Sequence, residues 1–140
     1  MTDPNASPPS VAPIIPPPRE ASWDLPCDPE AVAKARALAR EALADWNLTA
    51  AAEDVELIVS ELVTNAVVHA RPPIGLTLYA RGAAVRGEVV DHSTAVPRPV
   101  MVTLDEEYGR GLALVEAYAT RWGVDPLPTG KVVWFVWSRS

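Results

Sequence analysis

The apolar residues of this 140-residue chain change their spacing at Arg71-Pro72-Pro73. Before these prolines, residues 28–70 place apolar side chains three and four positions apart, which is typical of amphipathic helices. After them come two short apolar segments, residues 75–81 and 85–90, whose Val and Tyr residues favour strands. This order predicts an α/β domain in which helices cover one face of a sheet.

Start and stop signals divide residues 28–70 into two helices. Asp28-Pro29-Glu30 offers an aspartate as N-cap, a proline for the first helical position and an acidic first turn. We expect this helix to reach Trp46 and to end at Asn47. Thr49 is the expected N-cap of a second helix, which runs to about residue 70. The second helix carries an apolar stripe formed by Val55, Ile58, Val59, Leu62 and Ala66.

The second half of the chain predicts most of the sheet. Gly82-Ala83 links the two short segments into a β-hairpin. Residues 91–108 have no clear period and predict a loop, which is followed by a third helix over about residues 112–119. We expect residues 124–130 to be a loop and residues 131–137 to be the last strand. The elements together predict a two-layer α/β sandwich, with a mixed, mostly antiparallel sheet and helices on one face.

The N-terminal segment differs from the rest of the chain. Its prolines, at positions 4, 8, 9, 13, 16, 17 and 18, oppose both helix and sheet. We expect residues 1–22 to be a disordered or polyproline II tail and residues 23–140 to form one folded domain. The tail is either a solvated leader or a docking motif, and only Ile14 and Ile15 support docking.

Composition limits the compartment and the partners. The formal net charge of -6 argues against nucleic acid as the main partner, because duplex binding needs clustered Lys and Arg. No apolar run approaches the roughly 20 residues that cross a bilayer, and the N-terminus has no signal-peptide pattern. The single cysteine, Cys27, cannot form an internal disulfide. We therefore expect a cytoplasmic protein that binds neither membranes nor nucleic acid.

Three polar residues of the second predicted helix, Glu61, Asn65 and His69, are spaced four apart and lie close to one line along it. The amide oxygen of Asn65 suits a hard cation such as Mg²⁺, which also takes phosphate oxygens and waters. Glu61 is then placed to orient or deprotonate a nucleophile. The alternatives are structural: a tolerated helical Asn, a solvated surface Glu, and a His that interacts with the helix dipole.

Asp91 comes at the end of an apolar strand. It is either a turn residue or a carboxylate at a pocket mouth, where it accepts a hydrogen bond from the amino group of a base. Further along, Gly109-Arg110-Gly111 precedes the third helix. Glycines let the backbone approach a ligand, the N–H groups of a helix start attract anions, and Arg110 adds charge-assisted bonds to phosphate. The alternative is an ordinary turn, because neither a P-loop nor a dinucleotide fingerprint is present.

The order and spacing of these features resemble the GHKL ATPases, and most closely the small bacterial anti-sigma-factor serine/threonine kinases. Residues 60–70, which include Glu61 and Asn65, look like the N box of these kinases. Val89-Val90-Asp91 looks like their first glycine box, and residues 109–115 look like the second. The ending, with Arg121-Trp122-Gly123 and residues 130–134, is also similar. The resemblance covers about residues 25–137.

The resemblance implies a histidine kinase-like ATPase fold with ATP and Mg²⁺ as cofactors. Asn65 would bind the magnesium ion, and Glu61 would be the catalytic base that acts on the hydroxyl of a protein serine. Asp91 would hold the amino group of adenine. The phosphates would be lined by Gly109, Arg110, Gly111 and Leu112, with residues 97–108 as a short lid.

The implied activity is that of a regulatory kinase, which transfers the γ-phosphate of ATP to a serine of an antagonist protein. A sigma factor is a second expected partner, and related kinases suggest a homodimer. One departure stands out, since Asp91-His92-Ser93-Thr94-Ala95 lacks the glycines of the first glycine box. The rival interpretation is a module that binds ATP without catalysis, or has lost ATP, and sequesters a partner. A third, a detached ATP domain of a histidine kinase, conflicts with the lack of a preceding helix pair bearing a phosphoacceptor His.

Overall fold

A computed structural model of the chain describes residues 19–69, 73–92 and 113–139. The helices and strands follow one another as β1 (Arg19–Leu25), α2 (Glu30–Asp45), α3 (Thr49–His69), β2 (Ile74–Arg81), β3 (Ala84–Asp91), β4 (Arg121–Leu127) and β5 (Gly130–Trp137). Residues 113–118 are also helical and lie ahead of β4. Helix α2, helix α3 and the β2–β3 hairpin confirm the elements predicted for residues 28–90.

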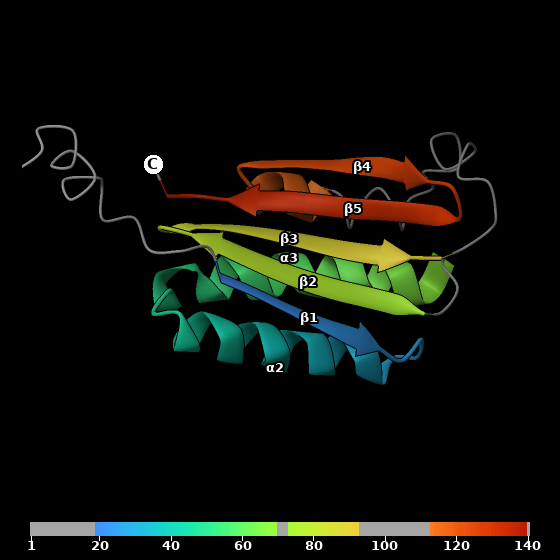
Figure 1. The fold of residues 1–140 in the computed structure, drawn as a ribbon, viewed down its shortest axis with the longest axis horizontal. Coiled ribbons are helices and arrows are strands. Elements are labelled where there is room, and N and C mark those ends of the chain that lie inside the picture. The colour runs from blue at the N-terminus through green and yellow to red at the C-terminus, as the bar shows by residue number, and fades with distance from the viewer. Residues whose placement is uncertain (1–18, 70–72, 93–112, 140) are drawn as a thin grey trace, which may run out of the picture.

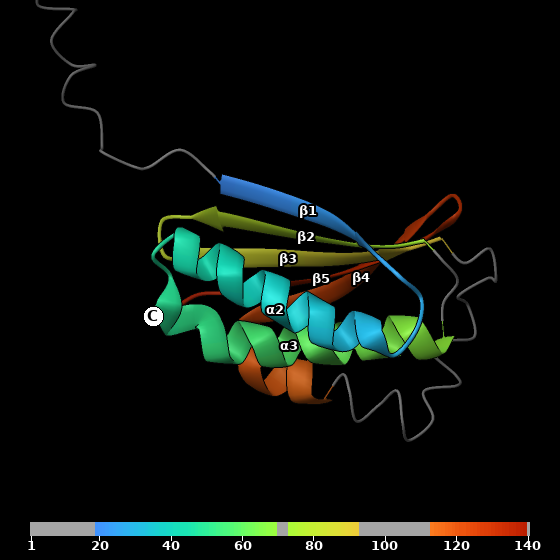
Figure 2. The same ribbon diagram turned by 90° about the horizontal axis from the view of Figure 1, so that it is seen from below.

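The strands form one five-stranded sheet in the order β1-β2-β3-β5-β4. Each of the four strand pairings is antiparallel. Helices α2 and α3 lie side by side on one face of this sheet, and the helical residues 113–118 lie on the same side (Figures 1 and 2). The predicted two-layer α/β sandwich with helices on one face is therefore confirmed, and its described strands are antiparallel throughout.

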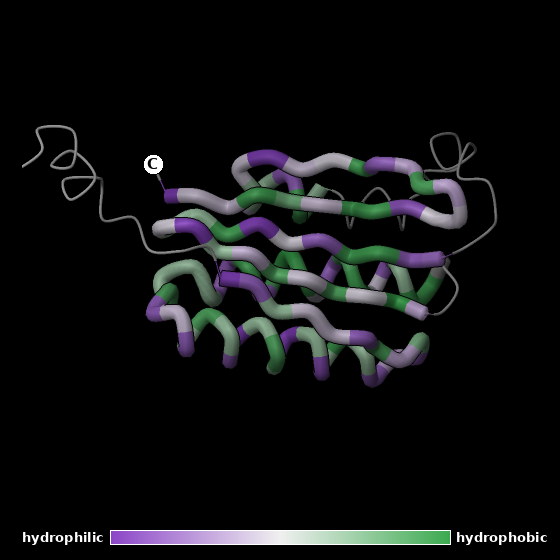
Figure 3. Tube along the Cα trace, viewed as in Figure 1, coloured by the Kyte–Doolittle hydropathy of each residue, from purple (hydrophilic) through white to green (hydrophobic). Residues whose placement is uncertain are grey.

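The core lies between the helices and the sheet. Along β2 and β3, buried residues alternate with half-buried or exposed ones, as expected for a sheet with one covered face. Figure 3 shows the matching change between hydrophobic and hydrophilic residues along β3. The stripe predicted on α3 is buried against the sheet, from Val55 at 0% exposure to Ala66 at 7%. From α2, small side chains such as Ala35 and Ala39 allow the helix to pack closely on α3. Phe135 is the largest side chain among those fully buried in the described residues.

Helix α2 begins one residue later than predicted, with Pro29 and not Asp28 as its N-cap, and it ends before Asn47 as expected. The carboxylate of Asp28 accepts a hydrogen bond from the backbone N–H of Glu30 over 2.8 Å, which satisfies one of the free donors at the helix start. Asn47 adopts a φ of 59° after the helix ends, a conformation that Asn tolerates better than most residues. The chain can therefore reverse direction and begin α3, in which Thr49 is the first helical residue and not the N-cap that was predicted.

Two strands were not predicted. Strand β1 begins at Arg19, so residues 19–22 belong to the sheet and not to the tail; residues 1–18 lie outside the described part of the chain. The Arg19 guanidinium donates to the carbonyl oxygen of Trp46 over 2.6 Å, and the Ser22 and Thr77 hydroxyls are 2.9 Å apart. These contacts join β1 to α2 and β2, and they need partners that are distant in sequence.

Strand β4 corrects the loop that was predicted for residues 124–130. Residues 124–127 are paired with β5, and Leu127 lies opposite Gly130 across a tight turn. Strand β4 is an edge strand, so its residues need not alternate between core and solvent, and it can contain Pro126. The sequence therefore lacked the alternating apolar pattern that would have predicted a strand here. No helix in the described residues is long and apolar enough to cross a membrane.

Candidate functional site

Helix α3 carries Glu61 and Asn65 one turn apart. Four residues advance a helix by about 6 Å, so the two side chains follow one another along the same side. Both are half-buried, while the neighbouring Leu62 and Ala66 are buried in the core. The two polar groups therefore lie at the border between the packed face of α3 and the surface. His69 is the last residue of α3, and its side chain lies outside the described part, so its two interpretations stay open.

The side-chain amide of Asn65 is incompletely satisfied. Its Nδ2 is buried and has no hydrogen-bond partner among the described residues. A buried polar group without a partner costs about 1–3 kcal/mol, so its presence in a helix calls for an explanation. The amide nitrogen and oxygen can exchange places by rotation of the side chain, and either atom can then serve a ligand. The unpartnered Nδ2 is a donor that suits an acceptor such as a phosphate oxygen, whereas a metal ion would need the amide oxygen in its place.

Asp91 is the last residue of β3 and is buried, with 2% of its surface exposed. It lies on the helix-covered face, since it alternates with the buried Val89. The Nζ of Lys131 on β5 donates to Oδ2 of Asp91 over 2.7 Å. Asp91 is therefore a buried, charge-paired group at a strand end, and its interpretation as an ordinary turn residue is wrong.

Lys131 is a site residue that the sequence analysis did not identify. The alternation of β5 places Lys131 on the same face as the buried Val133 and Phe135, and it lies directly opposite Asp91. A lysine in a buried register of a strand needs an acidic partner. The sequence alone shows a lysine at a core-facing position of an apolar strand. Its acidic partner could be identified only from the pairing of β3 with β5.

The backbone of Gly130 packs closely against the same aspartate. A Cβ at this position would overlap the carbonyl oxygen of Asp91, and the φ of Gly130 is +154°, which side-chain-bearing residues rarely adopt. Only glycine allows this approach, which brings the start of β5 against the end of β3. The close contact between Gly130 and the Asp91 carbonyl therefore fixes the strand ends that carry the Asp91–Lys131 pair.

These residues come together at one end of the molecule. Helix α3 ends, β3 ends and β5 begins at the same end of the domain, on the right in Figure 1. The second half of α3, which includes Glu61 and Asn65, therefore runs toward the end of the sheet where β3 ends at Asp91 and β5 begins just before Lys131. The helix segment with the unpartnered amide and the strand ends with the buried ion pair thus belong to the same half of the molecule.

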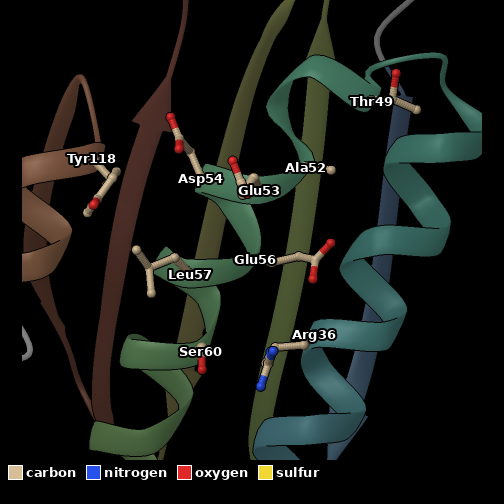
Figure 4. Close-up of a pocket in the computed structure, with 9 residues that line it drawn as sticks. All are labelled: Arg36, Thr49, Ala52, Glu53, Asp54, Glu56, Leu57, Ser60 and Tyr118. Atoms are coloured by element: carbon tan, nitrogen blue, oxygen red, sulfur yellow. The ribbon is translucent and has the colours of Figure 1, made fainter.

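An open groove of about 870 Å³ lies along the other half of α3 (Figure 4). It is lined by Arg36, Thr49, Ala52, Glu53, Asp54, Glu56, Leu57, Ser60 and Tyr118. Its acidic groups include Glu56, which forms an ion pair with Arg40 at 2.8 Å, and Asp54, which accepts a bond from Trp137 at 3.0 Å. The groove contains none of the predicted site residues, and two of its carboxylates, those of Asp54 and Glu56, already bind partners in the protein, so the groove does not overlap the predicted site.

The remaining predicted residues lie outside the described part of the chain: Gly109, Arg110, Gly111, Leu112, the expected lid over residues 97–108, and Ser93-Thr94-Ala95. Among the described residues, no cluster of His, Cys, Asp and Glu could hold a metal by itself. A magnesium ion at Asn65 would therefore take most of its ligands from phosphates and water, which is the usual arrangement for this ion. The amide oxygen of Asn65 is a ligand type that suits such an ion.

Comparison with known families identifies a domain that covers most of the chain. The sequence model of the histidine kinase-like ATPase domain matches residues 25–137, from the last residue of β1 to the last residue of β5. The match therefore includes α3, Asp91 and Lys131. No curated protein matches the chain significantly.

Proposed function

The chain belongs to the family of histidine kinase-like ATPase domains, and from that premise we propose that it is a regulatory protein serine/threonine kinase of the anti-sigma-factor type. It binds ATP with Mg²⁺ and transfers the γ-phosphate to a serine of an antagonist protein. One observation carries the proposal: the buried, unpartnered amide of Asn65 follows Glu61 by one helical turn, at the end of the sheet that carries Asp91.

Asn65 and Glu61 have separate roles on α3, in metal binding and in proton transfer. The Asn65 amide would hold the magnesium ion together with phosphate oxygens and waters. The ion supplies charge neutralisation for the phosphates during transfer. Glu61, half-buried and one turn earlier, accepts the proton of the serine hydroxyl as a general base. Its position at the edge of the packed face keeps it within reach of a protein substrate.

Asp91 recognises the base. Its carboxylate is buried, pairs with Lys131, and would accept a hydrogen bond from the 6-amino group of adenine. On this proposal the phosphates meet Gly109, Arg110, Gly111 and Leu112, with residues 97–108 as the lid.

The proposed partners are proteins. The substrate is an antagonist of the anti-anti-sigma type, a sigma factor is a second candidate partner, and the kinase acts as a homodimer in the cytoplasm. A net charge of -6 disfavours nucleic acid and an anionic membrane surface as targets.

A second candidate function is a non-catalytic module that sequesters its partner. Two observations favour it: no glycine occurs in Asp91-His92-Ser93-Thr94-Ala95, and the Asp91 carboxylate already pairs with Lys131. In that case ATP either sets the conformation of the domain or does not bind, and Glu61 has no proton to accept.

Calorimetric titration with ATP, in magnesium and again in EDTA, separates these functions. The kinase proposal expects micromolar binding that depends on magnesium, followed by phosphoserine in a purified antagonist protein from the same organism, detected by mass spectrometry. Binding without transfer to any antagonist of the organism supports the non-catalytic module. The absence of binding in both buffers contradicts the kinase and leaves the module that works without ATP.

A further inference from the structure

Resting on the proposed function, we infer that Lys131 is a base-specificity residue, which donates a hydrogen bond to N1 of adenine beside the Asp91 carboxylate that accepts from the 6-amino group. The ion pair would then form two hydrogen bonds with adenine, in addition to joining β3 to β5. Lys131 lies in the ending of the chain that resembles the kinases, but the resemblance assigned it no role.

The geometry of the pair suits this role. The Lys131 Nζ and Asp91 Oδ2 are 2.7 Å apart, so a hydrogen-bond donor and an acceptor are presented next to each other. The two side chains differ in exposure: 3% of Asp91 and 13% of Lys131 are accessible. The ammonium is thus the outer member of the pair. It has three N–H donors, and its bond to Asp91 uses one of them.

The surrounding backbone fixes the direction of the pair. Asp91 and Lys131 are opposite residues of the β3–β5 ladder, and both are on the face covered by α3. Gly130 packs against the Asp91 carbonyl, so the start of β5 cannot move away without loss of this contact. A preorganised donor and acceptor lose little freedom when a ligand binds, which increases their contribution to affinity.

The pattern of the pair matches one purine edge. Adenine places an amino donor next to the N1 acceptor, the complement of a carboxylate next to an ammonium. Guanine and hypoxanthine carry an oxygen and an N–H at these two positions. The same placement would set an acceptor against the Asp91 carboxylate and a donor against the Lys131 ammonium. The pair therefore favours ATP over ITP, and the N1 position of the base should be sensitive to Lys131.

A purely structural lysine would neutralise Asp91 without sensing N1, and a ligand double-mutant cycle distinguishes the two roles. Calorimetry with magnesium is run on the wild-type protein and on Lys131→Met, each with ATP and with 1-deaza-ATP, in which a C–H replaces N1. We expect the wild type to bind 1-deaza-ATP about tenfold more weakly than ATP. Lys131→Met should bind ATP about tenfold more weakly and should no longer distinguish the two nucleotides. Lys34→Met, at an exposed lysine of α2, is the matched control and should behave as the wild type.

Circular dichroism shows whether Lys131→Met folds. If it does not, the comparison of ATP with 1-deaza-ATP on the wild-type protein still tests the inference. Equal affinity of the wild type for ATP and 1-deaza-ATP overturns the inference without any variant. If the folded variant discriminates between the nucleotides as the wild type does, the inference is also overturned, while ATP binding and the proposed function stand. If the wild type binds no ATP, both fail together.

Discussion

The indole N–H of Trp137 donates a hydrogen bond to Oδ2 of Asp54 over 3.0 Å. The bond joins the last residue of β5 to the first half of α3. Trp137 is buried, with 9% of its surface exposed, and Asp54 is half-buried. The bond therefore anchors the helix that carries Glu61 and Asn65 to the strand that carries Lys131.

Trp137→Phe should lower the free energy of unfolding by at least about 1–2 kcal/mol, because the half-buried Asp54 carboxylate loses a donor and the smaller phenyl ring fills the core less completely. Urea unfolding of the wild type, Trp137→Phe, Asp54→Ala and the double variant measures the coupling. A coupling energy near zero would show that the bond does not contribute to stability.

Gly130→Ala should destabilise the fold by at least about 2 kcal/mol more than Gly82→Ala. At position 130 the new Cβ overlaps the backbone of Asp91, and the φ of +154° is unfavourable for alanine. Gly82 is the matched control, because its φ is also positive, at +59°, but no atom lies within 4 Å of a Cβ there. Equal losses in thermal or urea unfolding would refute the claim that close packing against Asp91 requires glycine.

The sequence predicted the elements whose signals are local. Asp28-Pro29-Glu30 and Asn47 mark the ends of α2, and Gly82-Ala83 marks the turn between β2 and β3. Each of these signals acts within a few residues, through capping, a positive φ or an alternating pattern. The position of Asn65 on α3, one turn after Glu61, followed from the helix period alone.

The elements that were missed depend on distant partners. Strand β1 is stabilised by pairing with β2 and by the bond from Arg19 to Trp46, 27 residues away in sequence. Strand β4 is an edge strand with a proline and mostly exposed residues. Lys131 could be identified as a site residue only from its bond to Asp91, which is 40 residues earlier in the sequence. No periodicity within one segment could have supplied these contacts.

Tyr79 on the uncovered face of the sheet should make the fold sensitive to alkaline pH. Burial, and then the carboxylates of Glu88 and Glu20, raise the pKa of Tyr79 above its ordinary value of 10.0, and Arg86 lowers it. A raised pKa in the folded state means that stability is full below about pH 10 and falls as pH rises through this range. Tyr79→Phe should flatten that fall, as measured by urea unfolding between about pH 9 and pH 11. Parallel stability curves for the two proteins would contradict the prediction.

Asn65→Ala should abolish magnesium-dependent nucleotide binding without loss of stability. The variant removes a buried amide nitrogen that has no described partner and improves helix propensity, so the free energy of unfolding should stay within about 1 kcal/mol of the wild type or rise. The affinity for ATP in magnesium should fall at least about tenfold. Calorimetry and urea unfolding on the same preparation test both parts. Unchanged affinity would remove Asn65 from the site, and a large loss of stability would assign it a structural role.

Glu61→Gln should retain nucleotide binding and stop phosphoryl transfer. The amide is nearly the same size as the carboxylate but cannot accept the proton of a serine hydroxyl, and loss of a general base costs about 100-fold to 10,000-fold in rate. Single-turnover formation of phosphoserine on the antagonist protein, with enzyme in excess, reports this step separately from product release. Glu41→Gln, at an exposed position on α2, is the control for removal of one negative charge and should transfer phosphate at the wild-type rate. If Glu61→Gln transfers phosphate as fast as this control, Glu61 is a surface residue of α3, and the base must be sought elsewhere.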